Sequence, residues 1–213
     1  MDVTVLYNLT YGLYVVGTMD GERPVGCVIN TCFQVTSQNP IIAISLNKNN
    51  HTTEVLKRNP RFSLSIITEE TDVVTIGTFG FQSCKNEGVD KYGEFGYTMH
   101  EGAPLVNGKF AGRLVCDVLN MVDNETHMVV LARVVDTVKG EGHPMTYEYY
   151  HKVVKGSAPK NAPTYREEPK QEATPVKKKW RCDVCGYVVE ADALADDFKC
   201  PICKMGREHF KEV

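Results

Sequence analysis

The sequence predicts a mainly β fold in two parts, a barrel of short strands followed by a small C-terminal domain. Three observations lead to this prediction. Short β-branched and aromatic runs, separated by turn residues, fill the first 155 positions. A proline-rich, charged stretch with almost no aliphatic side chains follows at 156–179. The last 34 residues are too few for a conventional hydrophobic core, but they carry four cysteines.

The strands of the first part can be read from composition and alternation. We expect them at residues 14–18, 24–30, 41–46, 61–68, 114–122 and 128–138. Several alternate polar and apolar positions, as in the F-S-L-S-I run at 62–66, which is typical of a half-buried strand. Short helices are expected near 3–9, 51–58 and 71–77. Many short strands with few helices favour a closed or partly closed barrel.

The stretch at 156–179 separates the two parts. It holds four of the ten prolines and many charged side chains. Such a composition cannot bury enough apolar surface to become part of a core. We therefore expect a linker, together with the C-terminal tail of the barrel, and a domain division of 1–155, 156–179 and 180–213.

Charge and hydropathy exclude several classes of protein. The 24 basic and 27 acidic side chains nearly balance, so we expect no nucleic-acid partner. No apolar run approaches the roughly 20 residues of a membrane helix, and the start lacks the pattern of a signal peptide. We expect a cytoplasmic protein without a membrane partner. No G-x-G-x-x-G follows a strand, which argues against a Rossmann nucleotide site.

Two C-x-x-C pairs, Cys182 with Cys185 and Cys200 with Cys203, form the most specific motif of the chain. In a reducing compartment such pairs are typical of a tetrahedral metal site rather than of disulfides. Iron and zinc both accept four thiolates, so the spacing leaves a structural zinc site and a redox iron site open. Gly186 suits the turn after the first pair, where positive φ turns backbone N–H groups toward the sulfurs.

The residues around the cysteines bear on the choice between zinc and iron. The chain reads W-R-C-x-x-C-G-Y at 180–187 and C-P-x-C at 200–203. Four aromatic residues would surround the metal: Trp180, Tyr187, Phe198 and Phe210. This segment resembles the short-loop rubredoxin domain appended to rubrerythrins, which implies one iron cycling between Fe3+ and Fe2+. Lys204 stands where that family usually has a glycine, which puts the turn of the second pair in question.

Other motifs lie in the first part. The longer ones are L-T-Y-G-L-Y-V-V at 9–16, G-C-V-I-N-T-C-F-Q-V-T at 26–36 and N-P-I-I-A-I-S-L-N-K-N-N-H-T at 39–52. Shorter ones lie at 83–91, 125–127 and 149–151. Together they resemble the flavin reductase-like split β-barrel that binds FMN, over nearly all of residues 1–165. Cys84 and Thr126 depart from that family, in which glycine and aspartate are common at these places.

The resemblance implies cofactor-binding roles for ten residues and assigns no catalytic acid or base. Three would line the isoalloxazine: Asn30, Thr31 and Cys32. Three would follow the ring and the ribityl chain: Ser45, Leu46 and Asn47. His51 and Thr52 would meet the phosphate at the start of a short helix, where free N–H groups favour an anion. Lys91 and His127 would supply positive charge or hydrogen bonds. Taken singly, each also fits an ordinary role, such as a strand end or a helix cap.

Joined in one chain, the two parts resemble the high-molecular-weight rubredoxin family. The resemblance implies an NAD(P)H-dependent oxidoreductase, in which FMN accepts a hydride from NADH or NADPH. Single electrons would then pass through the iron centre to an external acceptor, a flavodiiron O2 or NO reductase. It also implies a homodimer with FMN near the subunit interface.

Two other functions remain open from the sequence. The first is a free-flavin reductase that releases reduced FMN to a separate monooxygenase. The second is a zinc-ribbon module that binds nucleic acid or protein beside a ligand-sensing barrel. The basic run at 177–181 is the best support for this second function, although three lysines at the end of a linker more often keep it solvated.

Overall fold

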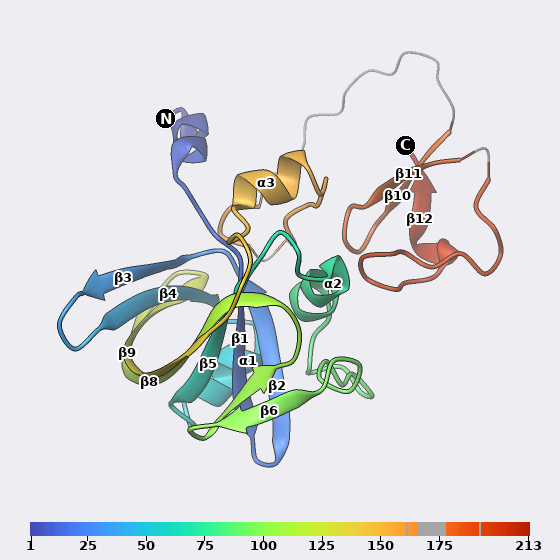
Figure 1. Ribbon diagram of the computed structural model, residues 1–213. Coiled ribbons are helices and arrows are strands. Elements are labelled where there is room, and N and C mark those ends of the chain that lie inside the picture. Colours follow the sequence, from blue (N-terminus) through green and yellow to red (C-terminus); the bar gives the residue numbers. More distant parts are fainter. Residues whose placement is uncertain (161, 166–177, 192) are drawn as a thin grey trace.

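A seven-stranded antiparallel sheet forms the N-terminal part of the chain (Figure 1). The computed structural model describes residues 1–160, 162–165, 178–191 and 193–213. Half of the expected linker, 166–177, together with residue 161, lies outside the described residues. In spatial order the strands are β2 (Arg23–Ile29), β1 (Tyr14–Asp20), β5 (Arg61–Ile67), β8 (Phe110–Asn124), β9 (His127–Lys139), β4 (Ile41–Asn47) and β3 (Cys32–Thr36).

The two edges of this sheet are close in sequence. Strand β2 is one edge and β3 is the other, yet only Asn30 and Thr31 separate them in the chain. Three Cα–Cα steps join Ile29 to Cys32 and span at most about 11 Å, so the sheet must curl until the adjoining ends of its two edges lie close together. No pairing between β2 and β3 is present among the described strands, and the barrel is therefore split at Asn30 and Thr31.

The apolar core fills the inside of the curled sheet. Its main cluster contains Phe62 and Leu64 of β5, which are 0 % and 1 % exposed. The alternation in β5 predicts that the intervening serines face solvent, and this prediction is wrong. Ser63 and Ser65 are 2 % and 1 % exposed. The hairpin of β6 (Tyr97–His100) and β7 (Ala103–Val106) packs on that face, and the Ser63 hydroxyl donates to the Pro104 carbonyl at 2.6 Å.

Three short helices and a 3-10 turn complete the barrel. Helix α1 (His51–Leu56) follows β4 and packs on β1 and β2, while α2 (Val73–Phe81) packs on β2. Helix α3 (Tyr147–Lys152) begins at Thr146, whose side chain accepts a hydrogen bond from the Tyr149 N–H. The 3-10 turn η1 (Val3–Asn8) precedes β1. No helix of the described residues combines the length and apolar character needed to cross a membrane.

The C-terminal part, called the module below (residues 178–213), is a small three-stranded sheet around the cysteines. Its strands lie in the order β11 (Val188–Glu190), β10 (Lys179–Cys182) and β12 (Phe210–Glu212), with the 3-10 turn η2 (Arg207–His209) before β12. The four cysteines are themselves the centre of its buried cluster. The module lies beside α2 of the barrel (Figure 1).

Candidate cofactor pocket and metal centre

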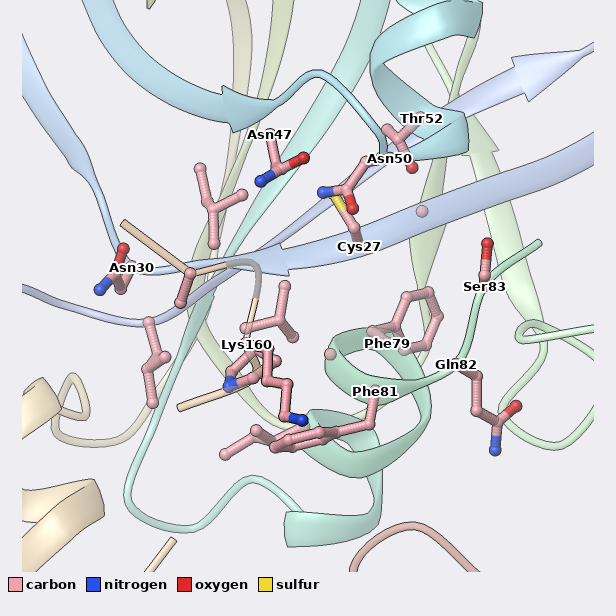
Figure 2. Close-up of a pocket in the computed structure, with 18 of the residues that line it drawn as sticks. Cys27, Asn30, Asn47, Asn50, Thr52, Phe79, Phe81, Gln82, Ser83 and Lys160 are labelled. Atoms are coloured by element: carbon pink, nitrogen blue, oxygen red, sulfur yellow. The ribbon is translucent and has the colours of Figure 1, made fainter. Parts of the chain in front are cut away.

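A pocket of about 350 Å³ opens where the barrel is split. The ends of β2 and β4, the start of α1, helix α2 and the segment after α3 all contribute to its wall. Figure 2 shows Asn30, Asn47 and Asn50 along one side, with Phe79 and Phe81 of α2 on the other. The pocket thus offers amide groups to one edge of a ligand and apolar surface to its body.

The apolar side is built from residues that belong to a buried cluster. Leu13, Ile76 and Phe79 are 3 %, 2 % and 1 % exposed and pack against one another. Such a wall suits a flat aromatic ring system and keeps water away from it. The amide side chains opposite are both donors and acceptors, which matches the mixed polar edge of an isoalloxazine.

Lys91 supplies a buried positive charge in the pocket wall. Its side chain is only 3 % exposed, and its ammonium donates to the carbonyl of Gly26 at 2.9 Å and of Phe79 at 3.1 Å. Burial lowers the pKa of Lys91, with the neighbouring Cys84 and Cys27 opposing the shift. No carboxylate of the described residues pairs with it, and an ammonium has three donors. The arrangement fits an anionic ligand such as FMN.

The start of α1 supplies a second anion-binding feature. Asn50 occupies the N-cap position without a side-chain capping hydrogen bond, and the first N–H groups of a helix lack intrahelical acceptors. Thr52 is 1 % exposed in this wall. Asp20, which does not line the pocket, contacts the His51 ring: Nε2 of His51 lies 2.8 Å from Oδ2 of Asp20. Hydrogen bonds from Arg58 and then His51 lower the pKa of Asp20.

Seven of the ten residues that the resemblance assigns to the cofactor line this pocket: Asn30, Ser45, Asn47, His51, Thr52, Lys91 and His127. Thr31, Cys32 and Leu46 do not line it. Side chains alternate along a strand, so Leu46, between two pocket residues, faces the core and is 0 % exposed. Cys32 packs against the same core, and the Thr31 hydroxyl donates to the side-chain oxygen of Asn30 at 3.1 Å.

The segment after α3 is part of the pocket, which the composition of 156–179 does not predict. Lys160 reaches into the pocket (Figure 2), and Ser157 and Pro163 lie along it. Thr164 fixes the segment in place, since its hydroxyl accepts from the Asn30 amide at 2.7 Å and donates to the Tyr147 hydroxyl at 2.9 Å. Pattern analysis could not find these residues, because only the fold brings them to the split in the barrel.

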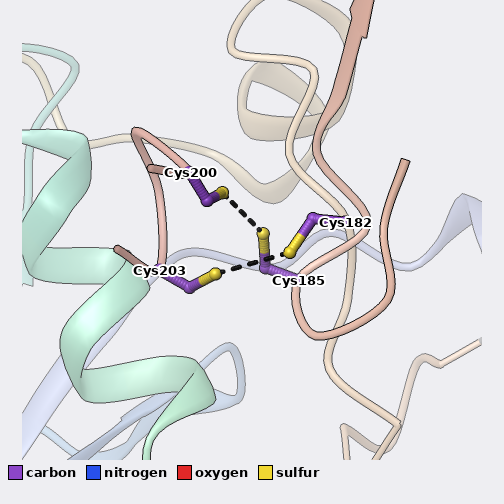
Figure 3. Close-up of side chains that lie close together, drawn as sticks. All are labelled: Cys182, Cys185, Cys200 and Cys203. Carbon is purple, nitrogen blue, oxygen red and sulfur yellow. Dashed lines mark hydrogen bonds between the residues drawn. The ribbon is translucent and has the colours of Figure 1, made fainter. Parts of the chain in front are cut away.

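The four cysteine sulfurs form a compact cluster in the module (Figure 3). All four lie within 4.8 Å of one another, with 3.6 Å between Cys182 and Cys203 and 3.4 Å between Cys185 and Cys200. A tetrahedral ion with metal–sulfur bonds near 2.3 Å requires about 3.8 Å between sulfurs. The cluster therefore fits one four-coordinate metal with small adjustments. The cysteines are at most 3 % exposed, so the site is closed to water.

The two C-x-x-C turns, called knuckles below, have the same backbone form. Gly186 N–H donates to the Cys182 carbonyl and Lys204 N–H to the Cys200 carbonyl, both at 2.9 Å. Gly186 has φ +77° and Lys204 has φ +61°. Lysine thus adopts the left-handed conformation that the family gives to glycine, and the second knuckle keeps its turn. A residue with Cβ pays about 1–2 kcal/mol for this conformation.

The cysteine sulfurs affect one another's ionisation. Contacts from the Cys185 and Cys203 sulfurs hold the pKa of Cys200 well below its usual range, whereas the pKa of Cys185 and of Cys203 is raised by contact with the Cys200 sulfur. The N–H groups of Tyr187 and Met205 are directed at the sulfurs of Cys185 and Cys203. Thiolates are the metal-binding form of cysteine, and such N–H groups stabilise their charge.

The module contacts the barrel at the edge of the cofactor pocket. Asp183 and Val184, from inside the first knuckle, form part of the pocket wall. The Ser157 hydroxyl donates to the Cys185 carbonyl. On the other knuckle, the Ile202 carbonyl lies directly over Gly77 of α2, and Figure 3 shows this helix beside the loop from Cys200 to Cys203. The metal centre is therefore adjacent to the pocket.

Comparison with known families agrees with both parts. Residues 6–157 match the flavin reductase like domain, and residues 180–211 match the rubrerythrin, rubredoxin-like domain. The high molecular weight rubredoxin of Moorella thermoacetica is 36 % identical over 231 aligned positions that cover 100 % of both chains. The ferric-chelate reductase (NAD(P)H) of Archaeoglobus fulgidus is 35 % identical over 78 % of this chain and 99 % of its own.

Solved structures share the fold of the barrel. The NADH:FAD oxidoreductase SgcE6 of Streptomyces globisporus superposes with a TM-score of 0.57 at 23 % identity, over 63 % of this chain and 79 % of its own. Flavoredoxin from Methanosarcina acetivorans gives a TM-score of 0.56 at 20 % identity, over 63 % of this chain and 74 % of its own. These likenesses support the split-barrel fold.

The pocket, the four-cysteine site and the two domain matches lead to one assignment. The rubredoxin-like match favours iron over zinc in the four-cysteine site, and the flavin reductase-like match assigns FMN to the barrel. The chain is an oxidoreductase for flavin-linked electron transfer and belongs to the flavin reductase-like family, in the high-molecular-weight rubredoxin arrangement with a C-terminal rubredoxin-like domain.

Proposed function

We propose that the chain takes a hydride from NADH or NADPH onto FMN in the barrel pocket and passes single electrons directly to the iron of the module. The iron then reduces an external protein acceptor, a flavodiiron O2 or NO reductase. One observation carries the proposal: Asp183 and Val184 of the first knuckle are part of the wall of the cofactor pocket. A donor site and an acceptor site that share a wall suit electron transfer within one chain.

Bound FMN would supply the conversion between two-electron hydride chemistry and the one-electron chemistry of iron. The protein binds and orients the ring. Asn30 and Asn47 offer hydrogen bonds to its polar edge, and Phe79 with Ile76 excludes water from its body. Lys91 stabilises negative charge from a desolvated position, where an ammonium acts more strongly than in water.

The donor is assigned by analogy with relatives. The Archaeoglobus fulgidus relative is a ferric-chelate reductase that uses NAD(P)H, and the Streptomyces globisporus neighbour is an NADH:FAD oxidoreductase. The protein's contribution to hydride transfer is positioning, because we assign no acid or base to the reaction.

The acceptor, the oligomeric state and the compartment are parts of the same proposal. The resemblance to high-molecular-weight rubredoxins supports a flavodiiron acceptor. The edge strand β3 exposes Phe33 and Val35 by 59 % and 48 %, which supports a homodimer that covers this edge. None of the eight cysteines, all of which are described residues, forms a disulfide, which supports the reducing cytoplasm as the compartment.

The enclosed wall of the pocket argues against the alternative function of a free-flavin reductase. Release of FMN in each turnover suits an open site, whereas here Lys91 is buried in the wall and Lys160 crosses the pocket, with Thr164 bonded to Asn30. The nucleic-acid function loses its main support, since Lys178 and Lys179 pair with Glu212 and Glu190. Lys177 lies outside the described residues.

The test is an anaerobic NADH titration of the full chain with FMN and iron bound, followed by absorption, with the zinc-substituted chain as control. We expect NADH to bleach the flavin bands in both, and the thiolate-to-iron band in the iron form, at catalytic rates. A flavin that reduces while iron stays ferric would overturn the relay. Elution of FMN during gel filtration would favour free-flavin reduction. Addition of a flavodiiron protein, with O2 consumption as readout, tests the acceptor.

A further inference from the structure

We propose that Gly77 and Ser157 form a docking seat for the metal centre, and that the surface held there is also the one through which iron reduces its external acceptor. This knuckle surface consists of residues 183–186 and 202–203. The knuckle surface cannot contact the seat and an external acceptor at the same time, so the module leaves the seat in every catalytic cycle. The inference rests on the proposed function, and it adds the positioning residues and the order of contacts.

Gly77 allows the close approach of the second knuckle. A Cβ at this position would lie 1.6 Å from the Ile202 carbonyl oxygen and 2.5 Å from its carbon. No side chain fits in this space, because backbone atoms fill it. Gly77 lies within α2 without a positive φ, so its own backbone does not require glycine. The approach of the module gives a physical reason for glycine at this place in the helix.

Ser157 holds the first knuckle. Its hydroxyl donates to the Cys185 carbonyl, and a Cβ on Gly186 would lie 2.4 Å from that hydroxyl oxygen. Each knuckle therefore meets the barrel at one close backbone contact, one on α2 and one on the segment after α3. Phe81 of α2 adds apolar contact by packing against the cysteine cluster.

Other sides of the metal site are covered by the module itself. Trp180, Phe198 and Phe210 pack around the cysteines, with the rings of Phe198 and Phe210 5.1 Å apart. Cys182 and Cys200 are each 0 % exposed. The rate of electron transfer falls steeply with distance. A protein acceptor is therefore reduced fastest when it docks on the knuckle surface, where only backbone lies between it and the cysteine sulfurs. In the docked arrangement the seat covers Ile202 and Cys203, which are 5 % and 1 % exposed, and part of the first knuckle, of which Asp183 stays exposed.

The contact is suited to release. Among the described residues, the ion pairs of Lys178, Lys179, Arg207, His209 and Lys211 all have their partners within the module, and none joins it to the barrel. In the described part of the chain, the seat offers a hydrogen bond from Ser157, together with packing at Gly77 and Phe81. Interfaces between domains of one chain with such polar and limited contact resemble transient protein–protein interfaces.

The experiment compares Gly77→Ala with Gly80→Ala in the full chain. Both add one methyl to α2, but a Cβ at Gly80 meets only the Val28 Cβ, at an ordinary 3.7 Å. Gly80 also lines the cofactor pocket, so Gly80→Ala is the control for docking and not for FMN binding. The first readout is independent of activity. High-spin ferric iron broadens NMR signals of nearby groups, and the zinc-loaded chain is the diamagnetic reference. We expect broadening of the Ile76 methyl groups in the wild type and in Gly80→Ala, and its loss in Gly77→Ala.

The second readout separates the two electron-transfer steps by stopped flow. We expect Gly77→Ala to slow reduction of the iron by NADH about tenfold or more, which corresponds to a docking equilibrium shifted by about 1.4 kcal/mol. Reduction of cytochrome c, used as a one-electron protein acceptor, by the dithionite-reduced chain should be as fast or faster. Ser157→Ala, which removes a hydroxyl and adds no atom, should change both rates in the same directions by a smaller factor.

Three outcomes would overturn the inference. Broadening that persists in Gly77→Ala would mean that the module does not use this seat. Unchanged iron reduction in a chain that has lost the broadening would mean that the seat is irrelevant to transfer. Slower cytochrome c reduction would mean that the acceptor does not use the exposed knuckle surface. Failure of NADH to reduce iron in the wild type would instead contradict the proposed function, and the broadening would still report on docking.

Discussion

The barrel surrounds its pocket with side chains that pack on one another, whereas the module surrounds its metal site with the ligands themselves. In the barrel, the pocket wall belongs to apolar clusters around Phe62 and Phe79, whose side chains pack on one another and coordinate no metal. In the module, four of the seven fully buried residues of the core are the cysteines. The barrel can therefore fold before it binds FMN, while folding of the module and metal binding are one process.

The largest expected effect is loss of the module on removal of one ligand. In Cys200→Ala we expect the metal-linked stabilisation, on the order of 10 kcal/mol, to be lost. Hydrogen-exchange protection should disappear in β10–β12 and persist in β5 and β8. Cys116→Ala is the matched control, because it removes an equally buried thiol from the barrel core. If the module of Cys200→Ala kept its hydrogen-exchange protection, folding of the module would not depend on the complete set of metal ligands.

The reciprocal change is made in the barrel core. Phe62 is 0 % exposed, and Phe62→Ala should lower the free energy of unfolding of the barrel by about 3–5 kcal/mol. The thiolate-to-iron band should survive at temperatures where the barrel has melted. Met99→Ala, at a site 47 % exposed, should change stability by less than about 0.5 kcal/mol. Loss of the iron band together with the barrel would mean that the two parts fold as one unit.

Substitution of Lys91 tests whether this side chain favours FMN binding while it lowers the stability of the barrel without FMN. We expect Lys91→Met to weaken FMN binding about ten- to a hundredfold, the effect of losing a charged hydrogen-bond donor. Isothermal titration of the apo chain measures this. Unaltered affinity would remove Lys91 from the binding site.

The same variant has a pH signature in the apo chain. Burial lowers the pKa of Lys91 in the folded state, so between that pKa and the ordinary value near 10.4 the unfolded chain binds more protons. Stability from this group therefore rises with pH in that window. Burial raises the pKa of the neighbouring Cys27, which acts with the opposite sign. The difference between wild type and Lys91→Met contains the lysine and its coupling to Cys27 and Cys84, and we expect wild type to gain relative to the variant as pH rises toward 10.

The smallest expected effect distinguishes the two knuckles. Lys204→Gly should stabilise the module by about 1 kcal/mol, because glycine adopts φ +61° without the Cβ penalty. Gly186→Ala should destabilise it, since its φ is +77° and Ser157 fills the adjacent space. The midpoint temperature for loss of the iron band measures both. Equal midpoints for Lys204→Gly and wild type would mean that the second turn is unstrained.

Elements with a strong local pattern were predictable. The seven-residue strands β4 and β5 begin at Ile41 and Arg61, where expected, and the cysteine spacing indicates the metal site without the fold. Strand β3 and the β6–β7 hairpin were not predicted. Both are short, and β3 is an edge strand with three exposed residues in five, so it lacks the buried alternation that marks a strand.

The candidate site was also predictable only in part, because some of its residues lie in recognisable motifs and others do not. Asn30, Asn47 and Lys91 lie in motifs that resemble a known family, and they line the pocket. Lys160 and Ser157 come from a stretch whose composition resembles a linker. Their position depends on how the segment after α3 returns across the split barrel, and that is set by tertiary contacts such as the one between Asn30 and Thr164. No periodicity within the segment encodes this contact.

Gly77 has a consequence for attempts to make the protein more heat-stable. In a helix interior, alanine in place of glycine usually raises stability by about 1 kcal/mol, so residue-by-residue optimisation would select this substitution in α2. The same substitution closes the space that the Ile202 carbonyl occupies. A library selected for thermal tolerance alone should accumulate alanine at 77, and a library selected for electron throughput should keep glycine there.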